Sequence, residues 1–386
     1  MNLDMRVVAL RETDGVESRV AVTPQSAARL VELGAAVGVE TGIGTHIRRS
    51  DNEYSAAGAS IGSRAGLLAE ADLLLAVRPP SQETVAALRP GAVVASFLDP
   101  FFNPRLVAQL ASAGISALCM ELIPRTTYAQ KMDALSSQAS LAGYAAVIAA
   151  AQRSIKAFPM MSTPAGTIAP ARVFVIGAGV AGLQAIATAK RLGARVEAYD
   201  TRPVVKEQVQ SLGARFVEID VGETGQTEQG YAKELSEEQL ARQREQMAKV
   251  CAGADVIITT AQVFGRRAPR IVDAAMVAGM KPGSVIVDMA ASSGGNVEGT
   301  EAGREVVTAN GVTIMGPANL PADVALDASQ MYASNLYLLV EHAWDKDAGG
   351  LKLDTSDDIV DACLLTHGGV VRDERVRAVV EREASS

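Results

Sequence analysis

Short apolar runs alternate with helical patterns along most of the chain. Each run is bounded by glycine, proline or polar residues, which is typical of buried strands. Strands that alternate with helices in this way predict parallel sheets connected by crossover helices. In the first third of the chain the predicted strands are residues 5–10, 37–41, 71–77, 92–98 and 115–123.

Several helices can be placed from their ends and their composition. Thr23 and Pro24 predict a helix start, because threonine is a favoured N-cap and proline is favoured in the first turn. Residues 133–158 form a long helical pattern rich in alanine, which predicts a helix bridging two domains and closed by a loop at 162–166. Residues 322–342 predict a helix that returns the chain to the first domain. We expect the charged residues 372–386 to be frayed.

One glycine-rich stretch organises the second half of the chain. An apolar run ending at Ile176 leads into Gly177-Ala-Gly179-Val-Ala-Gly182, and a helical pattern follows. In a dinucleotide-binding turn the first glycine allows the tight bend, the second admits a pyrophosphate, and the third lets helix and strand pack closely. The alternative is a tight turn between strand and helix in another kind of α/β domain.

An acid at the end of the next strand strengthens the first interpretation. Asp200 follows Gly177 by 23 residues, close to the roughly 20 expected of an acid that binds the adenosine ribose. A carboxylate would repel a 2′-phosphate, so we expect NAD(H) rather than NADP(H). Arg202 could reach the pyrophosphate or the adenine. The residues predicted to surround the nucleotide here are Gly177, Gly179, Val180, Ala181, Gly182, Asp200, Thr201, Arg202, Thr260, Ala261 and Gln262.

Composition excludes several classes of function. The 386-residue chain is long enough for two or three domains, and its net charge of −8 argues against a general nucleic-acid or anionic-membrane surface. Three cysteines and three histidines are scattered, so the sequence predicts no metal site. We see no signal peptide and no apolar run of about 18 residues, so we expect a soluble, cytoplasmic protein.

A polar cluster follows the strand predicted at 115–123. Arg125, Gln130, Asp133 and Ser136 lie close together in the sequence where the long helix begins, and a loop there could face a bound nicotinamide and its ribose. The alternative is that Asp133 only caps the helix and its neighbours are solvated.

From residue 5 to about residue 371 the chain resembles two related families that share a bilobal fold. These are alanine dehydrogenase and the NAD(H)-binding component of proton-translocating transhydrogenase. Both share the segment Arg19-Val-Ala-Val-Thr-Pro24, the glycine turn and the segment 281–288. Residues 124–144, 182–193 and 230–234 resemble transhydrogenase in particular.

The alanine dehydrogenase pattern fails where that family has its chemistry. Its substrate-binding lysine belongs to the strand end that here reads Leu75-Ala-Val-Arg78, and its catalytic histidine belongs where this chain reads Ser96-Phe-Leu-Asp99. Its acid before two glycines is replaced by Ser292-Ser293. Arg19 is retained, although its role could be structural. Arg78 and Asp99 also depart from the usual transhydrogenase pattern, and we expect them to lie outside the nicotinamide site.

The resemblance implies an α/β fold of two Rossmann-like, doubly wound parallel-sheet domains separated by a cleft and bridged by long helices. Their expected bounds are residues 1–132 plus 325–386 and residues 133–324. NADH bound here would pass hydride directly to NADP+ on a separate NADP(H)-binding component, while a membrane component carries the proton. The chain would be a homodimer held at the cytoplasmic face of the membrane by these partners, which we expect to be separate chains.

The resemblance also implies residue roles. Gln130 would lie at the junction of the two nicotinamides, and Arg125, supported by Asp133 and Ser136, would hold the carboxamide. The length and acidic composition of residues 220–236 predict either a lid or a disordered surface loop, and the resemblance implies that Tyr231 would close the lid, with Gly230 also binding the nucleotide. Alternative functions are an alanine-dehydrogenase-like enzyme and a non-catalytic NAD(H)-binding regulatory module. The cofactor-binding residues expected in the first domain and the bridging helix are Arg125, Thr126, Thr127, Tyr128, Gln130, Ser136, Ser137 and Gln138.

Overall fold

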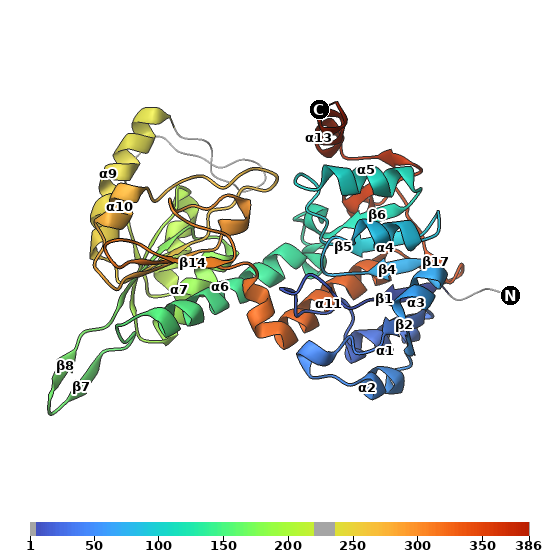
Figure 1. Cartoon of the computed structure of the whole chain (residues 1–386), viewed down its shortest axis with the longest axis horizontal. Helices are drawn as coiled ribbons and strands as arrows, with labels where there is room; N and C mark the ends of the chain where they lie inside the picture. Colours follow the sequence, from blue (N-terminus) through green and yellow to red (C-terminus); the bar gives the residue numbers. More distant parts are fainter. Residues whose placement is uncertain (1–4, 220–235, 386) are drawn as a thin grey trace. The chain divides into compact units, whose positions relative to one another are not determined.

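The computed structural model describes residues 5–219 and 236–385, and it divides the chain into two compact units (Figure 1). Unit 1 comprises Met1–Gln138 and Pro321–Ser386, and unit 2 comprises Ala139–Leu320. The chain leaves unit 1 within the helix α6 (Ala134–Arg153). Each unit has its own sheet and its own hydrophobic core, so each is described by itself.

Unit 1 is built on an eight-stranded sheet with the order β19-β18-β6-β5-β4-β1-β2-β3. Strands β1 to β6 are parallel, and their order 3-2-1-4-5-6 is that of a doubly wound Rossmann sheet. The last two strands extend the sheet in the antiparallel sense. The strands are β1 (Arg6–Ala9), β2 (Ala36–Glu40), β3 (Ser60–Gly62), β4 (Leu73–Leu75), β5 (Val93–Ser96), β6 (Ser116–Cys119), β18 (Leu364–His367) and β19 (Val370–Val371).

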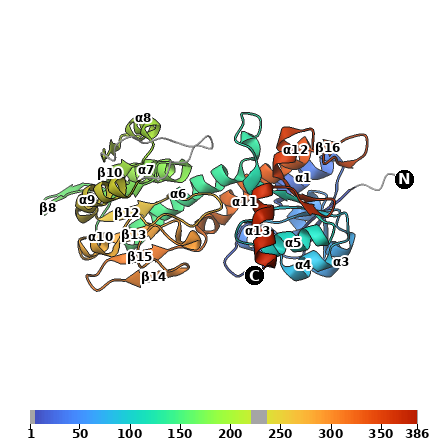
Figure 2. The ribbon, with the colours of Figure 1, turned by 90° about the horizontal axis from the view of Figure 1, so that it is seen from above.

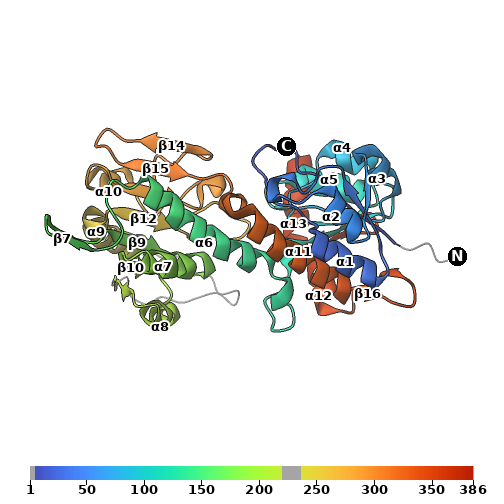
Figure 3. The same cartoon turned by 90° about the horizontal axis from the view of Figure 1, so that it is seen from below.

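The helices of unit 1 cover this sheet, and the first of them begins as predicted. The Thr23 hydroxyl accepts a hydrogen bond from the Ser26 N–H at 3.3 Å, and Gly34 ends the helix with φ 105°. In Figure 3, α11 runs beside α1. The helices are α1 (Pro24–Leu33), α2 (Asp51–Ala56), α3 (Arg64–Glu70), α4 (Gln82–Ala87), α5 (Pro104–Ser112), α11 (Ala325–His342), α12 (Asp358–Cys363) and α13 (Glu374–Ala384).

Helix α11 carries much of the unit 1 core. Tyr332, fully buried, donates its hydroxyl proton to the Ala76 carbonyl at 2.9 Å and accepts from the Phe97 N–H at 3.2 Å. Trp344 belongs to the same core and lies in a small hairpin of β16 (Trp344–Asp345) and β17 (Gly350–Leu351). Tyr332 therefore ties the helix to the ends of β4 and β5.

Unit 2 contains a seven-stranded sheet with the order β11-β10-β9-β12-β13-β15-β14. All neighbours are parallel except β14 with β15. When β14 is set aside, the order of the parallel strands is again the 3-2-1-4-5-6 of a Rossmann sheet. Strand β9 pairs with both β10 and β12, which places its carboxyl end at the point where the strand order reverses. The strands are β9 (Arg172–Ile176), β10 (Arg195–Tyr199), β11 (Arg215–Phe216), β12 (Val256–Thr259), β13 (Val285–Asp288), β14 (Arg304–Val307) and β15 (Thr313–Gly316).

The helices of unit 2 are α7 (Val180–Arg191), α8 (Lys206–Ser211), α9 (Glu237–Gly253) and α10 (Ala274–Ala278), joined by most of α6. Gly143 of α6 packs so closely on the Ala181 backbone that a Cβ there would overlap its carbonyl. Within the described ranges α6 is also the helix long and apolar enough to cross a membrane. Its residues Ala146, Val147 and Ala150 are fully buried in the unit 2 core, and buried helices of soluble proteins pass the same test.

Several local predictions were wrong. The segment predicted as a loop at 162–166 belongs to a hairpin of β7 (Met161–Thr163) and β8 (Gly166–Ile168), which projects from unit 2 in Figure 1. Strand β6 ends at Cys119 and a 3₁₀ turn follows, and α6 ends at Arg153 rather than at residue 158.

A further error concerns the end of the chain, which is helical rather than frayed. The Asp373 carboxylate accepts from the N–H groups of Arg375 and Val376, which caps the helix α13. Val376 is fully buried, and Figure 2 shows α13 beside α5. A narrow apolar stripe packs this otherwise charged helix against α5, as in other amphipathic surface helices.

Candidate nucleotide-binding site

The glycine turn after β9 has the geometry that a dinucleotide requires. Gly177 adopts φ 97°, and a Cβ there would overlap the Thr260 hydroxyl. A Cβ on Gly182 would overlap the Gly177 carbonyl oxygen, whereas no described atom lies within 4 Å of the position that a Cβ on Gly179 would take. Two of the glycines are thus required by internal packing, while the third borders open space that fits a phosphate group.

The helix after this turn offers hydrogen-bond donors. Gly179 is the N-cap of α7 and has no side chain to satisfy the first-turn N–H groups. Val180, in the first position, is 46% exposed. Backbone N–H groups and the positive end of the helix dipole favour an anion here.

Asp200 lies at the end of β10 beside the turn. Its carboxylate accepts from the Ala178 N–H at 2.8 Å and forms two further bonds with the Arg202 guanidinium, at 3.0 Å from Nε and 2.9 Å from Nη2. These hydrogen bonds raise the pKa of Arg202 above its usual range. The Arg202 guanidinium is therefore held on the Asp200 carboxylate. Thr201, between them, is half-buried.

The end of β12 is held by a residue that sequence reasoning missed. Asn296, fully buried, accepts from the Ala261 N–H at 3.1 Å and donates to the Ala261 carbonyl at 2.8 Å. Thr260 donates its hydroxyl proton to the Gly177 carbonyl at 3.1 Å, which joins this strand end to the glycine turn. Gln262 donates to the Met289 carbonyl. Thr260 is therefore fixed against the glycine turn, at the carboxyl ends of the strands, where open α/β sheets bind ligands.

In unit 1 the polar segment around Gln130 forms a single 3₁₀ turn, η3 (Gln130–Met132). Ala129 and Met132 are fully buried in the core, so they hold the turn with the Gln130 side chain exposed between them. Tyr128 is 84% exposed, and Arg125, Thr126 and Thr127 are also exposed.

Asp133 has the geometry of a helix cap. Its carboxylate accepts from the Ser136 N–H at 2.9 Å and from the Ser136 hydroxyl at 2.6 Å, at the start of α6. The two following residues point into unit 1: Ser137 donates to Asn335 at 2.7 Å, and Gln138 donates to the Ala328 carbonyl at 3.1 Å. Ser137 and Gln138 thus bind the protein itself.

The carboxyl edge of the unit 1 sheet is filled by internal pairs. Arg19 is 6% exposed and bonds to both carboxylate oxygens of Glu17, at 2.8 and 2.7 Å, and to the Gln138 side chain at 2.8 Å. Glu12 accepts from the N–H groups of Val77 and Arg78. Burial raises the pKa of Glu12 to about 7. The two hydrogen bonds lower this pKa, and the nearby acids Glu17 and Asp14 raise it further.

The predicted site residues are divided between the units. The segment 125–138 belongs to unit 1, and the glycine turn, Asp200–Arg202 and Thr260–Gln262 belong to unit 2. Gly230 and Tyr231 lie outside the described residues. Within those residues no group of three or more histidine, cysteine, aspartate or glutamate side chains could hold a metal ion.

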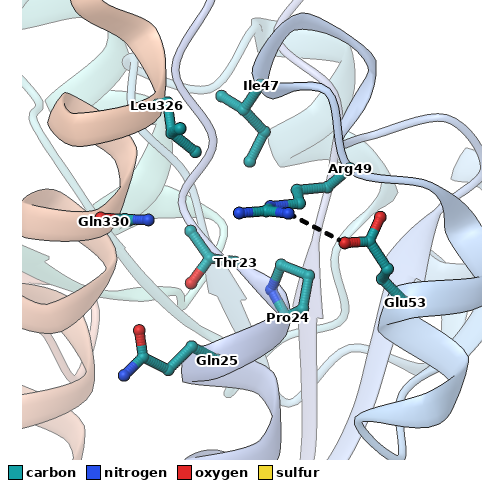
Figure 4. A pocket seen from close by; sticks show the side chains of 8 residues that line it. All are labelled: Thr23, Pro24, Gln25, Ile47, Arg49, Glu53, Leu326 and Gln330. Carbon is teal, nitrogen blue, oxygen red and sulfur yellow. Dashed lines mark hydrogen bonds and ion pairs between the residues drawn. The ribbon is translucent and has the colours of Figure 1, made fainter.

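A small pocket in unit 1 is lined by none of the residues predicted to bind the nucleotide or to take part in hydride transfer (Figure 4). Its volume is about 180 Å³, below the several hundred Å³ typical of ligand sites. The Arg49 guanidinium points into it and bonds to Glu53 at 3.1 Å. The pocket is lined by Thr23, Pro24, Gln25, Ile47, Arg49, Glu53, Leu326 and Gln330.

Two doubly wound sheets, one with a glycine turn at its switch point and an acid at the end of the next strand, define a dinucleotide-binding α/β protein. The chain belongs to the alanine dehydrogenase/PNT family. The family model of the N-terminal domain matches residues 8–142, and that of the C-terminal domain matches residues 146–374. This confirms the fold class and the resemblance found in the sequence.

The chain is more similar to transhydrogenase subunits than to alanine dehydrogenases, as its sequence motifs indicate. The chain is 43% identical to the first part of NAD(P) transhydrogenase subunit alpha of Rickettsia prowazekii over 382 residues, 98% of each chain. It is 44% identical to the protein of that name from Rhodospirillum rubrum, over 95% of this chain and 97% of the other. Alanine dehydrogenase of Mycobacterium tuberculosis is 28% identical, over 96% of each chain.

Solved structures of both kinds of protein are similar to this chain. A transhydrogenase from Sinorhizobium meliloti superposes with a TM-score of 0.86 at 45% identity, over 95% of this chain and 99% of the other. An L-alanine dehydrogenase superposes with a TM-score of 0.81 at 24% identity, over 98% and 99%, and shares the fold.

Proposed function

We propose that this chain is the NAD(H)-binding component of a proton-translocating NAD(P) transhydrogenase. The observation that carries the proposal is the 43% identity, over 98% of both chains, to a protein named as the first part of an NAD(P) transhydrogenase subunit alpha. The exposed Gln130 turn in unit 1 supports it, because this turn lies in a segment that resembles transhydrogenase in particular. The glycine turn in unit 2, which both families share, supports the binding of a dinucleotide.

The residues of unit 2 fit NAD(H). The open space at Gly179 and the N–H groups of α7 suit the pyrophosphate, and Asp200 suits the adenosine ribose. The ribose hydroxyls would have to displace Arg202 from part of the carboxylate. When bound, NAD(H) supplies the hydride that is exchanged with NADP(H) on a partner component.

The protein's own contribution is orientation and the exclusion of water, because hydride transfer needs no protein acid or base. Gln130 is exposed on a turn that two buried neighbours fix, which suits a residue at the junction of two cofactors. Arg125 would hold the carboxamide. Asp133 and Ser136, already bonded to each other, would support it.

Partners and location follow from the same proposal. An alpha subunit implies other subunits, here an NADP(H)-binding component and a membrane component that carries the proton and holds the chain at the cytoplasmic face. We also place a second copy of this chain in the assembly. The hairpin β7–β8 supports a homodimer, because it projects from unit 2 with Met161 43% exposed and Ile168 48% exposed.

The arrangement in unit 1 disfavours an amino-acid dehydrogenase. Such an enzyme needs a cation for the substrate carboxylate, and the guanidinium of Arg19 already bonds to Glu17 and Gln138. The strand ends that would carry lysine and histidine carry Arg78 and Asp99. Arg78 in turn pairs with Asp14 at 3.2 Å.

Mixing tests the proposal directly. The purified chain is combined with a soluble NADP(H)-binding transhydrogenase component, and hydride transfer from NADH to an NADP+ analogue is followed by absorbance. We expect transfer in the mixture and none with either protein alone. Turnover of alanine by this chain alone would establish the dehydrogenase instead, and nucleotide binding with neither reaction would establish a regulatory module.

A further inference from the structure

Three polar side chains form a row along one face of α11, at positions 329, 332 and 335. Ser329 and Tyr332 are fully buried, and Asn335 is 7% exposed. Positions three apart on a helix lie on the same face. Ser329 accepts from the Val20 N–H at 3.0 Å, and Tyr332 bonds to the ends of β4 and β5. The row therefore fixes α11 against the carboxyl edge of the unit 1 sheet.

Asn335, the last member of the row, bonds to the segment that carries Gln130. Its Nδ2 donates to the Lys131 carbonyl, inside the 3₁₀ turn, at 2.9 Å. Its Oδ1 accepts from the Ser137 hydroxyl, in the first turns of α6, at 2.7 Å. One side chain thus joins the residue after Gln130 to the helix that follows Asp133.

We propose that Asn335 is a positioning residue for hydride transfer, which sets the Gln130 turn relative to the Asp133–Ser136 pair. This inference rests on the function proposed above. The amide has only one productive orientation, because turning it over would place Oδ1 against the Lys131 carbonyl. An amide locked in this way restricts both ends of the segment at once, as a precise site requires.

Other contacts of the turn do not replace this one. Ala129 and Met132 anchor the turn by apolar burial, which is not directional. The bond from the Asp133 N–H to the Gln130 carbonyl, at 3.2 Å, lies within the turn itself. Asn335 instead connects the turn to a separate, fixed helix.

The first experiment measures local opening and does not depend on activity. Amide hydrogen exchange is compared in the full-length protein, in Asn335→Ala and in Gln330→Ala. Gln330 is an exposed amide on the same helix and serves as the matched control. We expect exchange in residues 126–137 to be about tenfold faster in Asn335→Ala and unchanged in Gln330→Ala. Unchanged exchange in Asn335→Ala would overturn the proposal.

The second experiment uses the mixture with the NADP(H)-binding component. Asn335→Ala should slow hydride transfer by about 10- to 100-fold, while the dissociation constant for NADH changes less than about threefold. Ser137→Ala, which keeps the bond to Lys131, should be affected less. Loss of rate and NADH affinity together, in proportion to lost stability, would mean a merely structural role.

A double-mutant cycle with Gln130→Ala shows whether Asn335 acts through that residue. If it does, the double variant with both Gln130→Ala and Asn335→Ala should transfer hydride no more slowly than the single variant Gln130→Ala. Additive losses would contradict the proposal. Absence of transfer in the unmodified mixture would refute the proposed function, and the hydrogen-exchange comparison would still decide whether Asn335 fixes the turn.

Discussion

The Glu17 carboxylate and the Arg19 guanidinium form two parallel hydrogen bonds, 2.8 Å from Nε and 2.7 Å from Nη2, in the interior of unit 1. The two side chains are 0% and 5% exposed, respectively. A planar guanidinium bonded in this way by an internal carboxylate is not available to a substrate carboxylate. Arg19 is thus bonded within the protein, as a structural residue would be.

Removing one partner of this pair should be costly. Glu17→Gln leaves Arg19 buried without its counter-charge, so we expect the free energy of unfolding to fall by about 3 kcal/mol. Urea unfolding measures the change. The exposed pair of Arg105 and Glu383, also in unit 1, provides the control: Glu383→Gln should cost less than about 1 kcal/mol. Equal effects would contradict the buried role of Glu17.

The glycine turn offers a matched pair of substitutions. Gly182→Ala forces a methyl group against the Gly177 carbonyl, so we expect a loss of about 3 kcal/mol of stability. Gly179→Ala meets no described atom and should change stability by less than about 1 kcal/mol, but it should weaken NADH binding at least about tenfold. Thermal unfolding and fluorescence titration with NADH measure the two effects. Full NADH affinity in Gly179→Ala would place the pyrophosphate elsewhere.

Asp200 should determine which dinucleotide binds. Asp200→Asn removes the negative charge that opposes a 2′-phosphate, and with it the ion pair between Asp200 and Arg202. We expect NADH affinity to fall about tenfold and NADPH affinity to rise, since a lost charged hydrogen bond is worth about 1.5–3 kcal/mol. Glu207→Gln, an exposed acid on α8, is the control. An unchanged ratio of the two affinities would remove Asp200 from the ribose site.

Glu12 should make stability depend on pH. Its pKa is raised from 4.5 to about 7, so between these values the folded state holds a proton that the unfolded state has released. The contribution of Glu12 to the free energy of unfolding is therefore greatest below pH 4.5 and falls as the pH rises to 7. We compare the free energy of unfolding of Glu12→Gln with that of the unmodified protein. This difference should increase in favour of Glu12→Gln by about 2 kcal/mol as the pH rises from about 5 to about 8.

Urea unfolding at several pH values measures this gain. Glu32→Gln, an exposed residue of α1, is the matched control. The same pH-dependent gain in both variants would show that burial of Glu12 is not its cause.

Local signals predicted much of the fold. Thr23 and Gly34 bound α1 because capping depends on a few adjacent residues. The order of the strands followed only from the family resemblance, since pairings such as β1 with β4 join residues more than 60 positions apart. The helix α13 was missed because a short apolar stripe among charges does not reveal the surface of α5 that covers it.

The candidate site could be predicted only in part, for a related reason. The types of residue around Gln130 indicated a polar site, but a helical pattern does not show that Ser137 and Gln138 face inward. Asn335 and Asn296 were missed, because each acts on a segment far away in the sequence. An isolated asparagine carries no local sign of a partner that lies far away in the sequence.

Trp344, the single tryptophan of the chain, lies in the core of unit 1. Its fluorescence therefore reports on the unfolding of that unit, whereas far-ultraviolet circular dichroism reports on the helices of both. If the units melt separately, the two signals will give different midpoints. NADH held by the glycine turn of unit 2 would then raise the dichroism midpoint and leave the tryptophan midpoint in place, so the two optical signals together would show which unit takes up the nucleotide.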